Sequence, residues 1–379
     1  MKKWTTVWGS SSGPAVRTEC NYGKNITFRY AIPVLCDGEQ IRITLSNLYS
    51  DEKCVINSLT VGKAEKVGER KTFDIRSLTF SNKTEGVIEK FSSLTSDPIS
   101  YPVKKGDILN VSFYIKDITK MATSTILIGT YSYGFFCEGD YSKSEDFPLF
   151  TERVASRHFF LTQLDVLSEN ATGWNFFGDS ITSYYWADDV KTLLMNEEEN
   201  KHNIAICRKT IAGARVLGEY KNWSTIQYGA SGFNRFEREI LEAYNCDKIL
   251  VFIGINDIIH PNGTVYRPMS NLPTPEQMID AYKFYIDIAR KHNKQIYFST
   301  IIPFKGWRSY TQERNEIRKG INEWIRSTDL IDGYIDFDEV IRDKDDFDKM
   351  PAHLTEDNLH PSKEGAMMMA QAFYDKFIK

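Results

Sequence analysis

The stretch GWNFFGDSITSYYW, residues 173–186, decides the fold of the chain around it. Its apolar run over residues 174–177 ends at Gly178, and from Ile181 onward apolar side chains recur at helical spacing. This pattern predicts a strand, a tight turn and a helix. The turn would place Ser180 at the edge of a sheet, beside helix N–H groups that have no partner within the helix. A serine that attacks a carbonyl needs such a place, although serine is also a common helix cap.

The rest of the chain from about Gly173 alternates between apolar strands and helical segments. The expected strands are residues 174–177, 204–207, 249–253, 295–301 and 331–337. The expected helices are residues 182–195, 233–244, 275–292, 311–327 and 362–378. Such alternation predicts a parallel sheet with helices on both faces, a three-layer α/β/α domain.

The N-terminal part shows short alternating runs separated by turn residues and no convincing helical period. The β-rich runs are residues 26–30, 41–45, 55–59, 108–113 and 126–129. Many short strands with turns between them predict a β-sandwich of jelly-roll type. A chain of 379 residues is also long enough for two domains. We place the junction near Asp165, with a β-sandwich over residues 1–165 and a catalytic domain over residues 166–379.

The composition is that of a soluble globular protein, with 41% hydrophobic and 26% charged residues. The 47 basic and 51 acidic residues give a net charge of -4, so nothing favours nucleic acid or an anionic membrane as a partner. No segment resembles a signal peptide or a membrane span. The sequence therefore predicts a cytoplasmic protein, or a secreted one if a leader has been lost. It predicts no oligomeric state.

The cysteines show no C-x-x-C pair and are spread along the chain. We expect reduced, mostly buried thiols rather than disulfides or metal ligands. The six are Cys20, Cys36, Cys54, Cys137, Cys207 and Cys246.

Four short stretches fit one acyl-transfer site. In chain order they are GDS (178–180), TIAG (210–213), GIND (254–257) and DNLHP (357–361). The first three follow expected strands, where ligands of parallel sheets bind, and the fourth precedes the last helix. His360 is the best candidate for the base that activates Ser180, and Asp357 is close enough to orient it. Considered alone, His360 would be interpreted as an ordinary loop histidine. The four stretches together predict the triad Ser180, Asp357 and His360.

In their order and residues, these stretches resemble the motifs of the SGNH hydrolases, also called GDSL hydrolases. The resemblance extends from about Gly173 to the C-terminus. The whole chain resembles the subgroup with an N-terminal β domain. The resemblance implies a flavodoxin-like catalytic domain and an oxyanion hole made of the Ser180 N–H, the Gly213 N–H and the Asn256 amide. Taken singly, Gly213 reads as a turn glycine and Asn256 as part of a loop.

The second stretch departs from the family pattern, which puts the lining of the pocket in doubt. Many members carry asparagine and glycine where this chain has Arg208 and Thr210. Arg208 or Arg215 could meet an acidic group of the substrate, although a structural ion pair is an equal alternative. The substrate-binding candidates are Asp179, Arg215, Tyr228 and Trp307. Aromatic side chains that could stack on a sugar, or merely pack in the core, are Trp186, Trp223, Trp307 and Tyr228.

The predicted function is a serine esterase that removes a short acyl group, acetyl above all, from a carbohydrate or related small ester. The sugar preference comes from the resemblance alone. No metal and no organic cofactor is expected. A lipase or acyl-thioesterase with the same triad is the first alternative. A metal phosphoesterase that uses the Asp, Asn and His side chains of these stretches is the second. The third is a carbohydrate-binding protein with an inactive hydrolase domain.

Overall fold

A computed structural model describes residues 1–15, 22–148, 152–153, 157–197, 202–220, 222 and 225–379. The chain divides into two compact units. The β unit consists of Met1–Gly173 with Glu197–Cys207, and the α/β unit of Trp174–Asn196 with Arg208–Lys379. The expected junction near Asp165 lies within strand β18 (Leu161–Ser168). Cys20 and Trp223 lie outside the described residues, and the other cysteines are buried.

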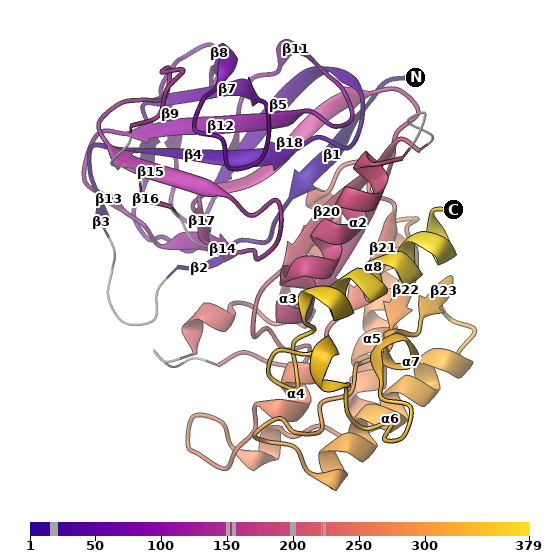
Figure 1. The fold of residues 1–379 in the computed structure, drawn as a ribbon. Helices are drawn as coiled ribbons and strands as arrows, with labels where there is room; N and C mark the ends of the chain where they lie inside the picture. The colour runs from indigo at the N-terminus through magenta and orange to yellow at the C-terminus, as the bar shows by residue number, and fades with distance from the viewer. Residues whose placement is uncertain (16–21, 149–151, 154–156, 198–201, 221, 223–224) are drawn as a thin grey trace. The chain divides into compact units, whose positions relative to one another are not determined.

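Two antiparallel sheets form most of the β unit (Figure 1). The first has the order β1 (Lys3–Gly9), β18, β5 (Gly38–Ser46) and β10 (Ser93–Thr95), with β11 (Ile99–Val103) also on β5. The second has the order β16 (Glu152–Arg153), β15 (Gly134–Glu138), β4 (Ile26–Pro33), β12 (Ile108–Ile115), β7 (Ser58–Ala64) and β8 (Phe73–Leu78). Smaller pairings join β3 (Tyr22–Gly23) to β13 (Thr119–Lys120), β6 (Cys54–Ile56) to β9 (Gly86–Ile88), and β14 (Thr123–Ile126) to β2 (Gly13–Pro14) and β17 (Arg157–Phe159).

The alternating pattern of the strands explains the sandwich. Ile41, Ile43 and Leu45 of β5 are fully buried, while the residues between them are only partly so. On the second sheet Phe28 pairs with Phe113 across β4 and β12, and their rings stack 5.3 Å apart. Apolar residues on one face of each strand thus form the core. The predicted β-sandwich is confirmed.

Two strand predictions in the β unit need correction. The expected strand over residues 55–59 is two strands, because Asn57 lies between β6 and β7 and bonds to the backbone of residues 114 and 116. The expected strand over residues 126–129 is wrong. β14 ends at Ile126, opposite Arg157, where its partner β17 begins.

A parallel sheet with helices on both faces forms the α/β unit, as predicted. The strand order is β20 (Ile204–Thr210), of which residues 208–210 belong to this unit, β19 (Thr172–Gly178), β21 (Lys248–Phe252), β22 (Gln295–Ser299) and β23 (Gly333–Ile335). The longer helices are α2 (Tyr185–Met195), α3 (Gly232–Glu242), α5 (Pro275–Lys291), α6 (Gln312–Ser327) and α8 (Lys363–Phe377). Short helical turns are α1 (Ser180–Ser183), α4 (Ile255–Ile259), α7 (Phe337–Ile341), η2 (Ile226–Tyr228), η3 (Met269–Asn271) and η4 (Ala352–Leu354).

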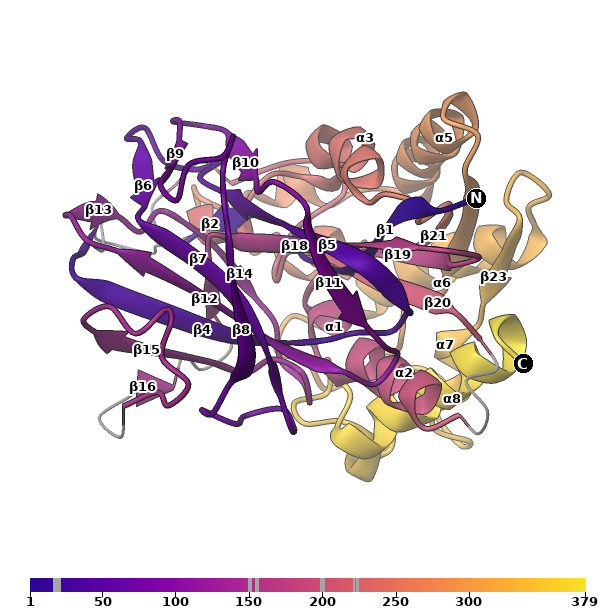
Figure 2. The ribbon, with the colours of Figure 1, turned by 90° about the horizontal axis from the view of Figure 1, so that it is seen from above.

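Strand β19 is buried on both faces, which is why its sequence is a continuous apolar run. The ring of Phe176 packs 4.9 Å from Trp186 of α2 and 5.0 Å from Phe373 of α8. On the other face, Phe177 packs 5.0 Å from Phe236 of α3. Figure 2 shows α2 and α8 on one side of the sheet and α3 and α5 on the other. Trp186 is therefore a core residue.

The helix expected over residues 182–195 is broken in the structure. Tyr184 has an extended backbone, with φ of -93° and ψ of -164°, and it separates α1 from α2. The Asp179 side chain accepts from the Ile181 N–H and caps α1. The break directs the Tyr184 side chain toward His360, on which its ring stacks.

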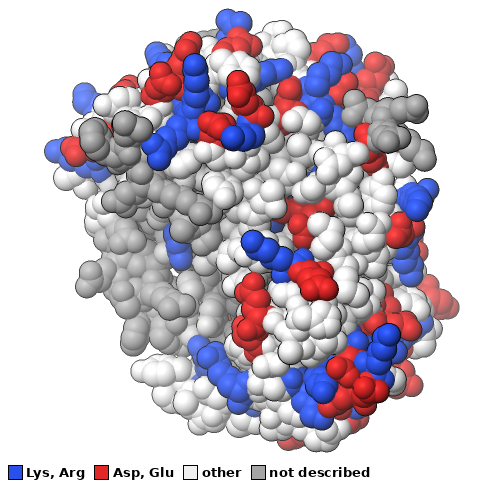
Figure 3. Space-filling model, in the orientation of Figure 1, with Lys and Arg blue, Asp and Glu red and all other residues white. Residues whose placement is uncertain are grey.

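On the face that Figure 3 shows, basic and acidic side chains are interspersed on each unit. None of the helices in the described ranges is both long and apolar enough to cross a membrane.

Candidate active site

Loops at the carboxyl ends of three neighbouring strands carry the first three motifs. Ser180 follows β19, Gly213 follows β20, and Asn256 follows β21. The Ile211 N–H donates to the Gly178 carbonyl, at 3.3 Å, and holds the first two loops together. The fourth motif, residues 357–361, precedes α8, which begins after the cap residue Ser362. All four belong to the α/β unit.

Ser180, His360 and Asp357 form a continuous hydrogen-bonded chain. The Ser180 Oγ lies 3.0 Å from His360 Nε2, and His360 Nδ1 lies 2.8 Å from an Asp357 carboxylate oxygen. An ionised carboxylate only accepts, so Nδ1 carries the proton and Nε2 accepts from the serine hydroxyl. This arrangement allows the imidazole to take the serine proton.

The Asp357 carboxylate also organises its own loop. Its Oδ1 accepts from the backbone N–H groups of His360, at 2.7 Å, and Leu359, at 3.0 Å. Partial burial works to raise the pKa of Asp357, but the hydrogen bonds from the His360 ring and from these N–H groups outweigh it and hold the pKa at about 2. The carboxylate therefore stays ionised throughout the range in which a histidine base works.

Two aromatic rings flank the His360 imidazole. Tyr184 stacks on it, with ring centroids 4.8 Å apart and planes 20° apart. Trp307 meets it edge-on, at 6.3 Å and 87°. The two rings restrict the imidazole to the plane that joins Ser180 and Asp357. Sequence reasoning expected Trp307 as a substrate contact and missed Tyr184, because the helical spacing there predicted an unbroken helix.

The second and third motifs are joined by a side-chain bond. The Asn256 amide donates to the Ala214 carbonyl, at 3.0 Å, which fixes its orientation and leaves a second N–H. Gly213 has φ of +83°, a conformation that favours glycine. A Cβ at this position would lie 2.1 Å from the Tyr228 ring. The chain therefore needs glycine here for both its backbone and its close approach to Tyr228.

Two buried carboxylates support these loops. Asp257 accepts from the backbone N–H groups of Val216, at 2.7 Å, and Leu217, at 3.0 Å. Burial raises the pKa of Asp257, and it raises the pKa of Asp179 to about 7, although the Ile181 N–H opposes the shift at Asp179. Each carboxylate is thus committed to backbone and neighbouring groups. No set of three or more His, Cys, Asp or Glu side chains in the described ranges is arranged to hold a metal ion.

The two arginines considered as substrate contacts make structural bonds. Arg215 is only 6% exposed, lies 3.5 Å from the Asp257 carboxylate, and packs over the Tyr220 ring. Arg208 is buried, lies 3.4 Å from Asp188, and donates to the Ser183 and Tyr184 carbonyls. Both placements match the ion-pair alternative.

The Tyr228 ring packs against the second motif and does not stand free as a surface for stacking on a sugar. Its ring stacks on His260, 4.9 Å away, and fills the space beside Gly213. His260 was not singled out in the sequence. It follows the third motif by only three residues, and this closeness was the signal available in the sequence.

The chain is similar to one known protein family and to several solved structures. The model of the GDSL-like lipase/acylhydrolase family matches residues 176–367. Among solved structures, a GDSL-like lipase from Bacteroides thetaiotaomicron VPI-5482 is 15% identical, covers 54% of this chain and 86% of its own, and has a TM-score of 0.39. An acetylxylan esterase from Geobacillus stearothermophilus is 18% identical, covers 54% and 93%, and has a TM-score of 0.40. A search of curated proteins gave no match.

Proposed function

Because the chain belongs to the GDSL-like lipase/acylhydrolase family and is a hydrolase of ester bonds, we propose that it removes short acyl groups, acetyl above all, from carbohydrates or related small esters. The observation that carries the proposal is the hydrogen-bonded chain from Ser180 through His360 to Asp357, with distances of 3.0 and 2.8 Å. The roles of these residues follow from their chemistry.

In the first half of the reaction, the Ser180 Oγ attacks the ester carbonyl carbon while His360 Nε2 takes the hydroxyl proton. Asp357 stabilises the imidazolium that forms. The tetrahedral intermediate collapses, the bond to the alcohol oxygen breaks, and His360 returns the proton to that oxygen. In the second half, His360 takes a proton from water, the water attacks the acyl-serine, and the carboxylic acid leaves with Ser180 restored.

The oxyanion of the tetrahedral intermediate needs donors that already point at it. We assign this role to the Ser180 N–H, the Gly213 N–H and the Asn256 N–H that Ala214 does not use. Such a donor commonly contributes about 3 kcal/mol to transition-state stabilisation. The bond from Asn256 to the Ala214 carbonyl supports the assignment, because it fixes the amide next to the Gly213 loop before substrate arrives.

A short acyl group fits the crowding at the second motif. The Tyr228 ring fills the space beside Gly213, so an acyl carbon chain next to the Gly213 N–H would have little room. The lipase and thioesterase alternatives need room for a long chain, and a chain-length series separates them from the acetylesterase. A metal-dependent reaction is disfavoured because Asp179, Asp257 and Asp357 are already committed to protein donors.

The test is hydrolysis of p-nitrophenyl acetate, butyrate and octanoate by wild type, Ser180→Ala and a control, Ser327→Ala, whose exposed hydroxyl bonds only within α6. Each is assayed with and without EDTA. We expect acetate to be cleaved fastest, EDTA to have no effect, and only Ser180→Ala to lose activity. Preference for octanoate would support a lipase, and loss of activity with EDTA would support the metal enzyme. Equal activity of wild type and Ser180→Ala would contradict the proposal.

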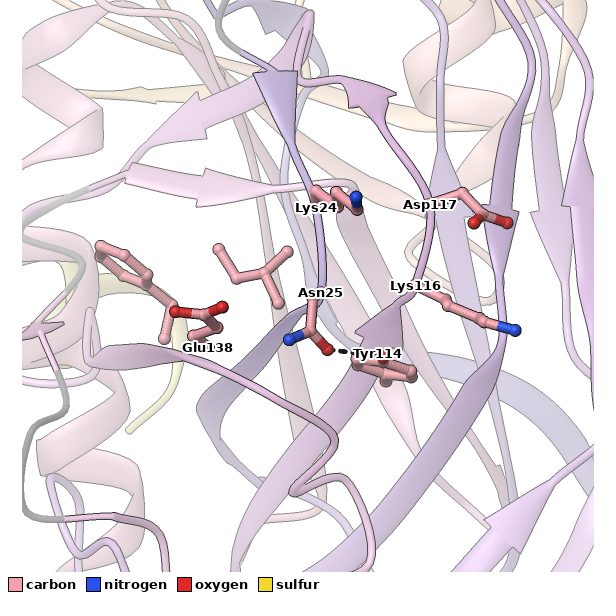
Figure 4. Close-up of a pocket in the computed structure, with 8 residues that line it drawn as sticks. Lys24, Asn25, Tyr114, Lys116, Asp117 and Glu138 are labelled. Atoms are coloured by element: carbon pink, nitrogen blue, oxygen red, sulfur yellow. Dashed lines mark hydrogen bonds between the residues drawn. The ribbon is translucent and has the colours of Figure 1, made fainter.

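A hollow in the β unit favours a second function, the binding of carbohydrate (Figure 4). Its volume is about 750 Å³, and it lies where β4 begins and β12 and β15 end. Half-buried Phe136, Ile26 and Tyr114 supply apolar and aromatic surface. The Tyr114 hydroxyl donates to Asn25 at 2.7 Å. Charged side chains at the hollow are Lys24, Lys116, Asp117 and Glu138.

Aromatic surface with polar groups of both signs suits a neutral sugar, which offers apolar ring faces and hydroxyl groups. Calorimetry on full-length Ser180→Ala with neutral oligosaccharides tests this role. Phe136→Ala should abolish binding, and Phe73→Ala, which changes an exposed ring of β8 outside the hollow, should not. Binding that Phe136→Ala leaves unchanged would place the sugar elsewhere.

A further inference from the structure

Two arginines, Arg267 and Arg308, lie near the active site. Arg267 and Arg308 form no salt bridge within the described part of the chain. They differ in this from Arg215 and Arg208, which pair with Asp257 and Asp188. An unpaired guanidinium is usually a solvated surface group, so its meaning depends on where it lies.

Arg267 lies beside the second motif. Its guanidinium carbon is 5.8 Å from the ring centres of both Tyr220 and Tyr228. The Tyr228 ring is the one that packs against Gly213, whose N–H we assign to the oxyanion hole. The Tyr228 ring therefore separates Arg267 from the proposed reaction centre.

Arg308 lies on the other side, beside the catalytic histidine. Its guanidinium carbon is 4.8 Å from the Trp307 ring centre, and that ring is 6.3 Å from the His360 imidazole. The loop of Trp307 also approaches the fourth motif directly, because a Cβ at Gly306 would lie 2.7 Å from the Asn358 side chain. Arg308 is thus also one ring away from the triad.

The two arginines approach a common neighbour, His260. The Ser309 hydroxyl donates to the Ile259 carbonyl at 2.9 Å, which holds the Arg308 loop next to His260. Burial is the main cause of the low pKa of His260, about 3, and the positive charges of Arg267, Arg215 and Arg308 lower it further. Of these three cations, only Arg215 has a carboxylate partner within the described residues.

Turns fix the backbone of both arginine loops. The Arg267 carbonyl accepts from the N–H groups of Asn262 and Gly263, at 2.9 and 3.1 Å, and the Arg267 N–H donates to Thr264, at 3.0 Å. Beside Arg308, the Trp307 N–H donates to Phe304 at 3.0 Å. Fixed backbones and ring contacts reduce the entropy that each side chain would lose on binding a ligand. Two nearby cations with no carboxylate partner among the described residues also favour an anionic ligand electrostatically.

We propose that Arg267 and Arg308 bind an anionic oxygen group on the alcohol part of the ester, so that the preferred substrates are acylated acidic sugars. The shared chemistry is a carboxylate, sulfate or phosphate, which a guanidinium binds through paired N–H donors. The inference rests on the proposed esterase function. The substrate's acyl group would lie at Ser180, and its anionic group would lie between the Tyr228 and Trp307 rings.

The experiment compares kcat/KM for three acetyl esters, an O-acetylated hexuronic acid, an O-acetylated hexose sulfate and the uncharged O-acetylated hexose. p-Nitrophenyl acetate is the reference that reports on the triad alone. We expect wild type to prefer an acidic ester, and each of Arg267→Gln and Arg308→Gln to lose about tenfold on it, the size of a lost charge-assisted hydrogen bond. Activity on the uncharged hexose ester and on p-nitrophenyl acetate should change less than about twofold. Arg290→Gln is the matched control, because Arg290 is a surface arginine of α5 that pairs with Asp332.

A second measurement uses wild type only, so it does not depend on the folding of any variant. Free hexuronate or free hexose sulfate should inhibit p-nitrophenyl acetate hydrolysis competitively, free hexose should not, and the inhibition should weaken with added salt. The uronate and sulfate arms identify which anion is bound. Equal kcat/KM for acidic and uncharged esters, with no inhibition by either anion, would overturn the inference. Absence of p-nitrophenyl acetate hydrolysis by wild type would instead overturn the esterase function.

Discussion

The ring of Tyr184 stacks on the imidazole of His360, with centroids 4.8 Å apart and planes 20° apart. Tyr184 reaches this position because the backbone is extended between α1 and α2, four residues after Ser180. A residue of the segment after the first motif thereby packs against the histidine of the last motif. The contact is between rings, so the hydroxyl group of Tyr184 is not needed for it.

We therefore expect Tyr184→Phe to keep the wild-type kcat and Tyr184→Ala to lower it about five- to tenfold, the value of an aromatic contact. KM for p-nitrophenyl acetate should change little, because the ring acts on His360 rather than on the ester. Steady-state kinetics at several pH values measures both parameters. If Tyr184→Phe were as slow as Tyr184→Ala, the hydroxyl and not the stacked ring would be responsible.

Replacing Asn256 by Ala should lower kcat by about a hundredfold and leave KM nearly unchanged, because an oxyanion donor acts in the transition state. Thermal unfolding must accompany the assay, since the Ala214 carbonyl loses its partner as well. Asn256→Asp keeps the shape but replaces the donor by an acceptor, and it should be at least as slow. A change confined to KM would contradict the oxyanion role.

Asp357→Asn should lower kcat/KM by a hundredfold or more, because an amide opposite His360 Nδ1 no longer selects the proton position that the reaction needs. The carboxylate side chain is 40% exposed, so water can replace part of its effect. Asp338→Asn is not a suitable control, since that carboxylate pairs with Arg318. Glu356→Gln, one residue earlier and exposed, is suitable and should remain active. Full activity of Asp357→Asn would mean that another group orients the imidazole.

Asp179 should make the protein less stable as the pH rises. Its folded pKa is raised to about 7 from 3.8, mainly by burial. Between these pH values the native state holds a proton that the unfolded chain has released, so the free energy of unfolding falls with rising pH. Asp179→Asn keeps an oxygen for the Ile181 N–H and cannot ionise. Urea unfolding between pH 4 and 8 should show a decline of a few kcal/mol in wild type that is missing in the variant. Parallel curves would contradict this.

Sequence reasoning predicted the architecture wherever periodicity decides it. The apolar run before Gly178 predicted a strand buried on both faces, and the rings of Phe176 and Phe177 pack on opposite layers as that requires. The motif order predicted that Ser180, Asp357 and His360 belong together. The first prediction depends on local periodicity, and the second depends on several motifs that follow strands of one expected sheet.

The missed features depend on tertiary contacts. The break at Tyr184 has no proline or glycine to announce it, and it is stabilised by a histidine 176 residues later in the chain. Arg267 lies in a turn whose position beside Tyr228 follows only from the folded loops. β14 likewise ends at Ile126, the residue that pairs with Arg157 of β17. None of these could be read from spacing along the sequence.

We propose that Ser180 is a nucleophile activated by His360. A fluorophosphonate forms a stable covalent bond with such a serine, and mass spectrometry of the intact protein and its peptides locates the adduct. We predict one adduct per chain, on Ser180, in wild type and in Ser327→Ala, and none in Ser180→Ala. Labelling should also slow greatly in His360→Ala. An unlabelled wild type, or an adduct that persists in Ser180→Ala, would contradict this role of Ser180.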